Sequence, residues 1–294
     1  MKGPIGPSKL SGRYKYMKSL IVMQSDFGID SGLVASMHGM CKLVDRELEV
    51  EDITHELPAF DVRAASYCLQ YTVPYWPEGT IFVSVVDPGV GTSRKASVVK
   101  LKNGSYVVTP DNGTLTFLQD MIGIDEIREI DETKNRYNNT RDVHTFHGRD
   151  LFSYCAARLA AGIISYEEVG EAYPVTEIVR HEVHTAEVSE KYVKANIQSY
   201  DPFGSAELSV LNVDFAKTGF KHGDMTDITI TCEGEVVFHE KVPYERSFGY
   251  VPINANLIFN DLASFVTLAC NQGYFAKKYH LDPEKEYTVE IREA

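Results

Sequence analysis

The sequence predicts an α/β protein, in which an N-terminal, mainly parallel sheet sandwiched by helices precedes a smaller all-β C-terminal barrel or sandwich domain. Strand-like and helix-like segments alternate from residue 19 to about residue 180, which is typical of a parallel sheet covered on both faces. Beyond residue 180 the chain becomes polar and acidic and continues as short β-rich segments. At 294 residues the chain exceeds the roughly 100–200 residues of one domain, which favours two.

Apolar periodicity and turn residues predict each element of the N-terminal domain. The expected elements are a strand at 20–25, a helix with one apolar side (Leu33, Met37, Met40, Leu43), a strand at 48–53, a helix at 61–72, a strand at 80–86, a hairpin at 96–100 and 105–109, and a helix at 149–161. Pro74 cannot continue a helix interior, Lys102-Asn103-Gly104 is typical of a hairpin turn, and Gly162 is a common helix terminator.

The C-terminal domain reads as strands separated by turn residues, which predicts a small barrel or sandwich. The expected strands lie at 193–200, 208–213, 227–232, 235–239, 256–259, 265–269 and 286–291. We expect an N-terminal domain at 18–182, a linker at 183–191 and a C-terminal domain at 192–294. Residues 1–17 lack the continuous apolar segment of a secretory signal and are expected to form a disordered arm.

The composition restricts the class of function. Five cysteines are scattered without CxxC spacing, and their odd number argues against a complete disulfide framework, so a reducing cytoplasm is expected. The formal charge of −13 disfavours nucleic acid and anionic membranes, since both are bound by clustered cations. No apolar run approaches the ~20 residues that span a bilayer. A neutral or cationic small molecule is the favoured partner.

Residues 84–94 (SVVDPGVGTSR) carry an acid and a cation at the end of a buried strand. The apolar run at 80–86 is typical of a strand in a parallel sheet, and open α/β sheets bind ligands beyond the carboxyl ends of their strands. Asp87 and Arg94 bracket the Pro/Gly turn that follows this strand. Both are therefore predicted to lie at the functional edge of the sheet.

Two more carboxylates, Asp26 and Asp30, follow the first strand, where an acid can accept hydrogen bonds from both hydroxyls of a ribose. Capping of the next helix is the alternative for each. The loop matches neither GxGxxG nor GxxxxGKS/T, which argues against dinucleotides and nucleoside triphosphates. We therefore do not expect this loop to bind phosphate.

His147 precedes a predicted helix within residues 145–150 (TFHGRD), beside a glycine that lets the backbone approach a ligand closely. It is the best general-base candidate, with a surface or capping histidine as the alternative. His144 and His55 are interpreted as structural, because nothing near either supplies metal-ligand spacing. Residues 110–113 (PDNG) are interpreted first as a turn and only second as a binding loop.

Residues 25–28, 87–94, 110–113 and 146–150 occur in an order and spacing that resemble the S-adenosylmethionine (SAM) hydroxide adenosyltransferase family, relatives of the fluorinase and chlorinase. The resemblance extends from about residue 19 to residue 279. It implies an α/β N-terminal domain, a β-rich C-terminal domain, and a homotrimer with active sites between neighbouring subunits. It also implies SAM as the substrate, adenosine as a product, and no metal or redox cofactor.

By this resemblance, water or hydroxide attacks the ribose 5′ carbon of SAM and gives adenosine and L-methionine. Asp87, Arg94 and His147 would form a water-handling triad: Arg94 would stabilise the developing hydroxide, and His147 and Asp87 would orient or deprotonate the water. The halogenating relatives carry tyrosine at the position of Asp87 and threonine at that of Val90. A carboxylate at Asp87 would repel chloride or fluoride, so hydroxide is the expected nucleophile.

The resemblance also assigns substrate-binding residues in both domains. Asp26 matches the acid that holds the ribose hydroxyls, and Phe60 matches an aromatic residue that lines the nucleoside pocket. In the C-terminal half the corresponding residues are Asp201, Phe203, Ser205, Phe248, Asn260, Asn271 and Gly273. Ser205 departs from the family pattern, in which an asparagine usually contacts adenine. Phe248 resembles an aromatic clamp on adenine, and a place in the core is the alternative for Phe203 and Phe248.

Two other classes of function remain open. The first is a phosphoester hydrolase with a divalent metal, which would be gathered by Asp26, Asp30, Asp87, Asp111 and His147. The second is a non-catalytic sensor of adenosine or SAM, in which the β domain recruits a partner; the departure at Ser205 favours it. Chelator sensitivity would select the first, and tight binding without turnover would select the second.

Overall fold

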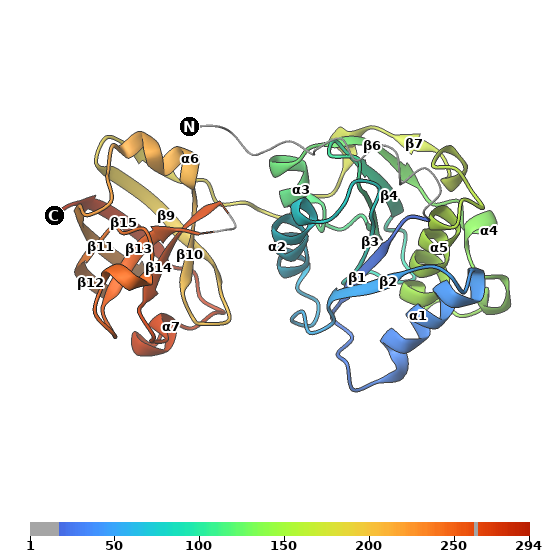
Figure 1. Cartoon of the computed structure of the whole chain (residues 1–294), viewed down its shortest axis with the longest axis horizontal. Coiled ribbons are helices and arrows are strands. Elements are labelled where there is room, and N and C mark those ends of the chain that lie inside the picture. Colours follow the sequence, from blue (N-terminus) through green and yellow to red (C-terminus); the bar gives the residue numbers. More distant parts are fainter. Residues whose placement is uncertain (1–17, 262–263) are drawn as a thin grey trace. The chain divides into compact units, whose positions relative to one another are not determined.

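The computed structural model describes residues 18–261 and 264–294, so the arm predicted at residues 1–17 lies outside the described residues. The chain forms two compact units, the first ending at His181 and the second running from Glu182 to Ala294 (Figure 1). Across the described residues, no helix is both long and apolar enough to cross a bilayer. All five cysteines are free thiols.

The first unit is built on a seven-stranded sheet with helices on both faces (Figure 1). Its strands are β1 (Ile21–Ser25), β2 (Val50–Thr54), β3 (Ile81–Val85), β4 (Ala96–Leu101), β5 (Tyr106–Pro110), β6 (Ile124–Glu129) and β7 (Ala172–Tyr173). Their order is β2-β1-β3-β5-β4-β6-β7, and the pairs among β2, β1, β3 and β5 are parallel. The pairs made by β4, β6 and β7 are antiparallel. The predicted site residues Asp26 and Asp87 follow β1 and β3, so they belong to the parallel half of the sheet.

Helices cover the two faces of this sheet. The α-helices are α1 (Gly32–Val44), α2 (Val62–Thr72), α3 (Thr116–Met121), α4 (Glu132–Asn135) and α5 (Tyr154–Ala160). A π-helical turn, η3 (Gly148–Ser153), precedes α5, and short 3-10 turns are η1 (Val73–Tyr75), η2 (Asn138–Thr140), η4 (Glu167–Val169) and η5 (Val175–Glu177). Gly162, predicted to end the helix at 149–161, follows α5 with a positive φ of 67°.

Alternate residues of the buried strands face opposite sides of the sheet, as the two-residue period of a strand requires. Ile21 and Met23 belong to a core that also contains residues of α1 and α5. Val22, which lies between them, belongs to a second core with residues of α2 and α3. The sheet is thus buried on both faces, which is why its central strands read as continuous apolar runs.

The predicted apolar side of α1 is correct for two residues and wrong for two. Met37 and Met40 are buried together with Cys41, but Leu33 and Leu43 are 40% and 62% exposed. The buried face follows the i, i+3, i+4 pattern of Met37, Met40 and Cys41. Leu43 lies six residues after Met37, which places it roughly 120° around the helix from that side chain.

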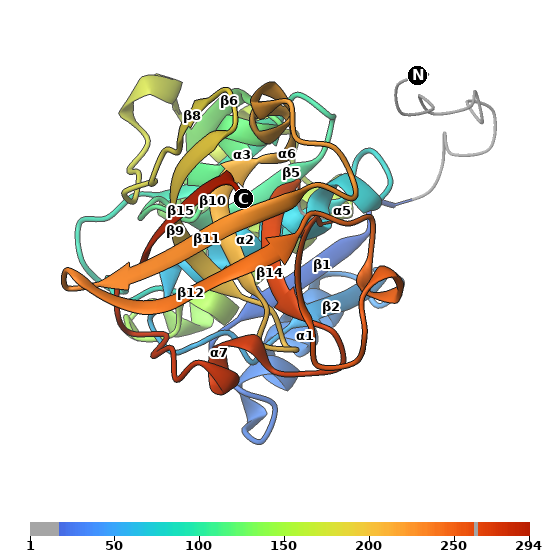
Figure 2. The same cartoon turned by 90° about the vertical axis from the view of Figure 1, so that its left-hand side faces the viewer.

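The second unit is an all-antiparallel sheet that nearly closes into a barrel (Figure 2). Its strands are β8 (Glu187–Ser189), β9 (Tyr192–Tyr200), β10 (Ala206–Leu211), β11 (Met225–Cys232), β12 (Glu235–Pro243), β13 (Asn256–Asn260), β14 (Phe265–Cys270) and β15 (Thr288–Glu293). The order is β12-β11-β15-β9-β10-β14-β13, and a bridge between Tyr244 and Ile258 brings the chain beyond β12 to β13. Short helices are α6 (Asn212–Phe215), η6 (Ala216–Thr218), η7 (Phe248–Tyr250) and α7 (Phe275–Lys278).

Each strand predicted for the C-terminal half corresponds to a strand of this unit. The strand β8 lies within the segment predicted as a linker, where it pairs with β9. The predicted fold class, an α/β unit followed by a smaller β barrel or sandwich, is confirmed.

Candidate active site

The carboxyl ends of β1 and β3 lie side by side, because Ser25 pairs with Val85 in the parallel register. A cavity of about 340 Å³ lies beyond these two ends. It is lined by Asp26, Phe27, Leu33, Ala59, Phe60, Val85, Asp87, Val90, Thr145, Phe146, His147 and Gly148. The cavity therefore occupies the crevice in which open α/β sheets bind ligands.

Arg94 holds the Asp87 carboxylate across the Pro/Gly turn after β3. Its Nε donates to Oδ1 at 3.0 Å and to Oδ2 at 3.1 Å, and its Nη2 donates to Oδ2 at 2.5 Å. The side chains of Arg94 and Asp87 are only 10% and 5% exposed, and the guanidinium carbon lies 5.2 Å from the centre of the Phe152 ring. This charge pair is shielded from solvent and has several hydrogen bonds, so its geometry is far better fixed than that of a surface salt bridge.

His147 joins this pair through Arg94. The distance from Arg94 Nη2 to His147 Nδ1 is 2.9 Å, and a guanidinium can only donate, so Nδ1 accepts and the proton of the neutral imidazole lies on Nε2. Nε2 is buried, and among the described residues it has no hydrogen-bond partner. Burial lowers the pKa of His147 below its ordinary value, and the charge of Arg94 lowers it further. A neutral imidazole with an unused donor is thus held at the cavity.

His147 enters the cavity at the start of the π-helical turn η3, which leads directly into α5. It occupies the position before the turn, but its side chain makes no capping hydrogen bond, so the capping alternative is wrong. The Ser153 hydroxyl donates to the Gly148 carbonyl at 2.8 Å within this turn. Turns of this kind are frequent at functional sites.

Gly148 allows close packing between η3 and the loop after β1. A Cβ at this position would lie 3.0 Å from Phe27 Cε2, and the Phe27 ring packs edge-on against Phe146 with centroids 5.7 Å apart. We expect Gly148→Ala to lower the free energy of unfolding by about 1–3 kcal/mol through overpacking. Gly39→Ala, in α1 with open space at the new Cβ, is expected to raise it by roughly 0.5–1 kcal/mol. Urea unfolding measures both, and equal stability of Gly148→Ala and the unmodified protein would contradict the packing argument.

Asp26 fixes the backbone of the loop that carries Phe60. Its Oδ2 accepts the Phe60 N–H at 2.9 Å, and Phe60 has a positive φ of 66° and is 72% exposed as a residue. Neither Asp26 nor Asp30 caps the next helix, because the Ser31 side chain caps α1 by accepting the Leu33 N–H at 3.4 Å. The capping alternative is therefore wrong for both acids, and only Asp26 lines the cavity.

Asp111 stabilises the fold and does not line the cavity. Its carboxylate is buried and accepts the Tyr173 hydroxyl at 2.9 Å and the Val179 N–H at 3.0 Å. Burial raises the pKa of Asp111. Its neighbour Asn112 donates through Nδ2 to the Val86 carbonyl at 2.9 Å, which fixes the end of β3 just before the turn that carries Asp87. Residues 110–113 thus act as a turn, in agreement with their first interpretation.

The five residues considered for a metal-dependent hydrolase do not converge. Within residues 18–261 and 264–294, no group of three metal-competent side chains includes Asp26, Asp30, Asp87, Asp111 or His147. The guanidinium of Arg94 lies between Asp87 and His147, where it would repel a cation. This arrangement favours a site that handles a neutral nucleophile over one that holds a metal ion.

The cavity also contains residues that the sequence did not single out. Phe27, Ala59 and Thr145 line it. Phe27 and Thr145 lie in the segments that carry Asp26 and His147, so their closeness to those residues in the sequence could have identified them as lining residues. Ala59 lies next to Phe60 in the same loop, for the same reason.

In the second unit, Asp201 organises the turn between β9 and β10. Its Oδ1 accepts the N–H groups of Phe203 at 2.9 Å and of Ser205 at 2.8 Å. Phe203 is 72% exposed, so the alternative interpretation of Phe203 as a core residue is wrong. Ser205 is buried. Gly204 packs directly against the ring of Tyr274, where a Cβ would overlap that ring. This turn therefore lies against the segment that follows Gly273.

Asn271 joins a second loop to this end of the unit. Its Nδ2 donates to the Val251 carbonyl at 2.8 Å, and a Cβ at Gly273 would lie 2.6 Å from Cys270 Sγ, which explains the glycine. Phe248, in η7, packs against another aromatic ring, that of Phe259, with centroids 5.0 Å apart. The predicted adenine and methionine contacts Asp201, Phe203, Ser205, Asn271 and Gly273 therefore gather at one end of the second unit.

Asn260 lies apart from that group. It pairs with Val266, whereas Asn256, at the other end of β13, pairs with Cys270 next to Asn271. The Asn260 side chain accepts the Tyr244 hydroxyl at 3.2 Å. Residues 262–263, which follow Asn260 closely in the chain, lie outside the described residues.

Both units match one protein family. Residues 21–170 match the family model described as SAM hydroxide adenosyltransferase N-terminal domain, and residues 195–288 match the corresponding C-terminal domain. The chain belongs to the SAM hydroxide adenosyltransferase family. The first match contains the loops of Asp26, Asp87 and His147, and the second contains those of Ser205 and Asn271. The resemblance inferred from the sequence motifs is therefore confirmed.

Relatives within the SAM hydroxide adenosyltransferase family extend over nearly the whole chain. A protein of Salinispora arenicola named (R)-S-adenosyl-L-methionine hydrolase is 32% identical and aligns with 92% of this chain and 97% of its own. The protein of that name from Thermus thermophilus is 33% identical over 85% of this chain and 91% of its own. A fluorinase of Actinopolyspora mzabensis is 25% identical over 90% and 95%. A crystal structure of an uncharacterized conserved protein from Thermotoga maritima matches with a TM-score of 0.84 at 32% identity, covering 93% of this chain and all of that one.

Proposed function

We propose that this protein hydrolyses S-adenosyl-L-methionine to adenosine and L-methionine. A bond forms between a water oxygen and the ribose 5′ carbon, the bond between that carbon and the sulfonium sulfur breaks with its electron pair passing to sulfur, and one proton leaves the water. The arrangement that carries the proposal is the joined group of Asp87, Arg94 and His147 at the cavity, in a family whose relatives include named SAM hydrolases.

The cavity suits a nucleoside carrying a positive charge. Its volume of about 340 Å³ is within the range of small-molecule sites, and aromatic rings line it together with two carboxylates. Asp26 has one oxygen bound to the Phe60 N–H, which leaves Oδ1 to accept the ribose hydroxyls. The carboxylate of Asp26, which is bonded to a backbone N–H and not to a guanidinium, adds negative charge that attracts the sulfonium.

The hydrogen-bond directions divide the roles within the triad. His147 accepts from Arg94 through Nδ1, so its Nε2–H donates and orients the attacking water. Asp87 is the group of the three that can only accept, and it therefore takes the proton that the water loses. Arg94 fixes both partners and stabilises the oxygen as its negative charge develops.

A weak base is sufficient for this reaction. The sulfonium sulfur accepts the electron pair of the breaking bond and becomes a neutral thioether, which leaves without assistance from an acid. The protein mainly positions water in line with the carbon–sulfur bond, and positioning of this kind can contribute about 7–11 kcal/mol. The reaction needs neither redox chemistry nor a metal.

The second unit is proposed to bind the adenine and the methionine tail. Asp201, Phe203, Ser205, Asn271 and Gly273 are assigned to these contacts, together with Phe248 in η7 and Asn260 at the end of β13. Following the family resemblance, we assign the complete site to the interface between neighbouring subunits of a homotrimer. Size-exclusion chromatography with light scattering tests the trimer independently of activity.

Incubating the purified protein with SAM is expected to produce adenosine and methionine in equal amounts, measured by chromatography. Added fluoride or chloride is expected to yield no 5′-halogenated adenosine, because the carboxylate of Asp87 repels a halide. Treatment with a chelator is expected to leave the rate unchanged. Failure to form adenosine after prolonged incubation would contradict the proposal, and tight calorimetric binding of SAM in the same preparation would then select the sensor alternative.

A further inference from the structure

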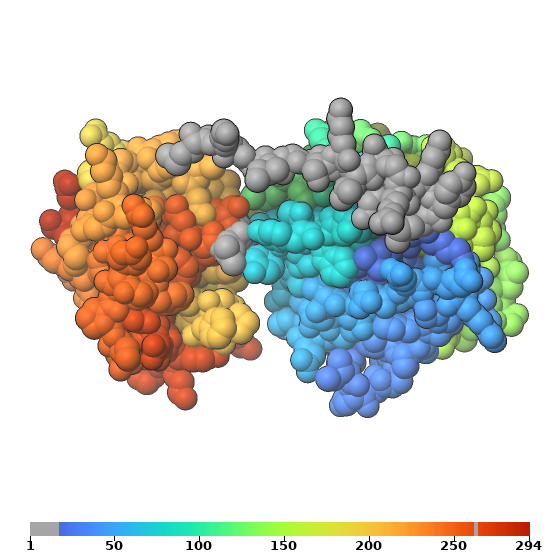
Figure 3. All heavy atoms as spheres, viewed as in Figure 1, coloured from blue at the N-terminus to red at the C-terminus, as the bar shows by residue number. Residues whose placement is uncertain are grey.

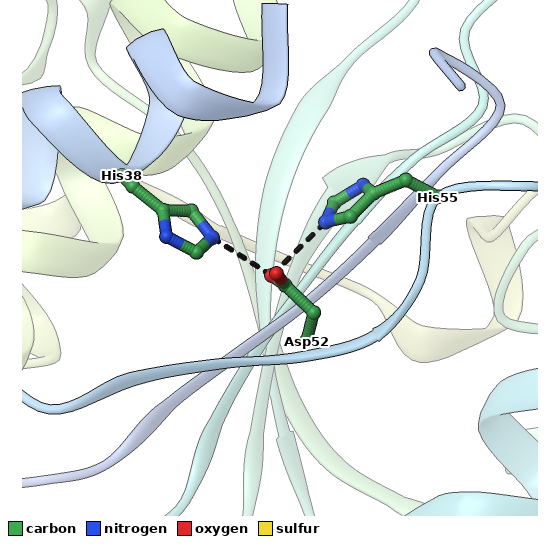
Figure 4. Close-up of side chains that lie close together, drawn as sticks. All are labelled: His38, Asp52 and His55. Atoms are coloured by element: carbon green, nitrogen blue, oxygen red, sulfur yellow. Dashed lines mark hydrogen bonds and ion pairs between the residues drawn. The ribbon is translucent and has the colours of Figure 1, made fainter. Parts of the chain in front are cut away.

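Two imidazoles and one carboxylate converge outside the catalytic cavity. Figure 4 shows the rings of His38 and His55 directed at the carboxylate of Asp52. His38 Nε2 lies 2.8 Å and His55 Nε2 lies 3.0 Å from Asp52 Oδ1. In the part of the chain that the structure describes, these are the three His, Cys, Asp or Glu side chains whose ligand atoms lie within 4.8 Å of one another. None of them lines the cavity of the proposed active site.

His55 is held in a fixed orientation by the fold. Its side chain is 2% exposed, and its Nδ1 lies 2.6 Å from the hydroxyl of buried Ser25. This contact directs Nε2 towards Asp52. Histidines that bind metals characteristically have their second ring nitrogen in contact with an outer group, which sets the orientation of the ring. The arrangement is thus independent support for a ligand role, beyond the proximity of the three side chains.

The other two side chains are open to solvent, which gives an ion a route to the group. Asp52 and His38 are 36% and 32% exposed, and the segments that carry them, α1 and β2, lie on the surface of the first unit (Figure 3). Asp52 is a carboxylate in contact with both imidazoles, in a chain whose net charge of −13 attracts cations.

We propose that His38, Asp52 and His55 form a binding site for a divalent transition-metal ion of the Zn²⁺ type. The ligands would be the two Nε2 atoms and one carboxylate oxygen, a set that Zn²⁺ accepts together with a water in the fourth position. Bond lengths of about 2.0–2.1 Å place tetrahedral ligand atoms roughly 3.4 Å apart. The observed separations of 2.8 and 3.0 Å approach this value, and small rotations of the exposed His38 and Asp52 side chains supply the difference.

Metal binding at this group needs no net loss of a proton. With Asp52 accepting from both rings, each neutral imidazole carries its proton on Nε2. On binding, each proton moves to Nδ1 of its own ring, and the lone pair of Nε2 becomes available to the ion. The Nδ1–H of His55 then donates to the Ser25 hydroxyl, and that of His38 faces solvent.

The site connects to the loop that follows β1. The His55 carbonyl accepts the Gly28 N–H at 2.7 Å, and Ser25, which contacts the His55 ring, directly precedes Asp26. An ion at the three side chains would therefore tie α1, β2 and this loop together. The proposal does not depend on SAM hydrolysis, since none of its three ligands is assigned to the reaction.

The test is a titration of the tag-free, chelator-treated full-length protein with Zn²⁺ and, separately, Co²⁺. Calorimetry is expected to show one ion per chain, and the visible spectrum of Co²⁺ is expected to show tetrahedral nitrogen and oxygen ligation. His38→Ala removes one ligand from the surface of a helix and is expected to weaken binding at least about tenfold. Asp52→Asn is expected to do the same.

His239→Ala is the matched control. His239 Nε2 lies 2.7 Å from Asp227 Oδ1, so this pair repeats the contact between His38 and Asp52 on the surface of the second unit, and no third metal-competent side chain of the described residues joins it. Its removal is expected to leave ion binding unchanged. Zn²⁺ is also expected to raise the melting temperature of the unmodified and His239→Ala proteins but not that of His38→Ala. Absence of saturable binding, equal affinity of the His38→Ala and His239→Ala proteins, or a thiolate charge-transfer band with Co²⁺ would each overturn the proposal.

Discussion

Replacing Asp87 with asparagine is expected to lower kcat for SAM hydrolysis by roughly 10²- to 10⁴-fold, the range typical of a lost general base. The amide has nearly the same shape as the carboxylate, but it can neither take a proton from water nor accept three hydrogen bonds from Arg94. The substitution leaves Asp26, the proposed contact of the ribose, unchanged, so the dissociation constant for adenosine is expected to change little. Steady-state kinetics and calorimetry with adenosine measure the two effects separately.

Asp142→Asn provides the matched control for this substitution. Asp142 is an exposed acid, close in sequence to His147 but absent from the cavity lining. The same change from carboxylate to amide there is expected to leave kcat unchanged, which separates a local effect from a general loss of negative charge. Similar rates for the Asp87→Asn and unmodified proteins would refute the assignment of Asp87 as the proton acceptor.

His147→Ala is expected to reduce kcat about 100-fold and to alter its dependence on pH. Burial and the charge of Arg94 lower the pKa of His147, so the neutral imidazole required to accept from Arg94 persists below the ordinary histidine value of about 6.5. We expect kcat/KM of the unmodified protein to be level from pH 8 to about 6.5 and to fall only at lower pH. The contribution of His147 to that fall is expected to be absent from the variant.

The same shift in pKa predicts how stability changes with pH. The unfolded chain binds a proton at His147 near pH 6.5, whereas the folded protein does so only at lower pH, so the free energy of unfolding falls as pH drops from about 6.5 through the folded value. His147→Ala is expected to show a shallower fall in this window. His144→Ala, an exposed histidine in the same segment, is expected to match the unmodified protein in both measurements. Identical pH profiles for the His147→Ala and unmodified proteins would contradict the proposed role.

The fold could be predicted from the sequence because strands that are buried on both faces consist almost entirely of apolar residues. β1 and β3 are buried along their whole length, and such strands read as apolar runs that need no alternation. The exposure of Leu43 was not predictable in the same way. Which side of α1 faces the sheet depends on how the helix docks, and the apolar residues at its ends do not specify this.

The candidate site was predicted as a set of residues but not as a geometry. Strand ends identified Asp87 and Asp26, since topology alone places such positions at one edge of a sheet. The contact between Arg94 and His147 joins residues 53 positions apart, and no local pattern shows which ring nitrogen faces the guanidinium. His55 was interpreted as structural because nothing near it in the sequence supplies metal-ligand spacing. His38 comes from a helix that precedes β2, so its proximity to Asp52 and His55 arises only in the folded chain.

The backbone of Phe60 has an unfavourable conformation in the structure. A left-handed conformation at a residue with a side chain is unfavourable by about 1–2 kcal/mol, and the hydrogen bond from its N–H to Asp26 helps to hold it there. Glycine would adopt this conformation freely but would remove the aromatic ring from the cavity. At this position the protein thus gives up part of its folding stability to keep an aromatic surface ready for a ligand, so selection for binding and selection for stability favour different residues.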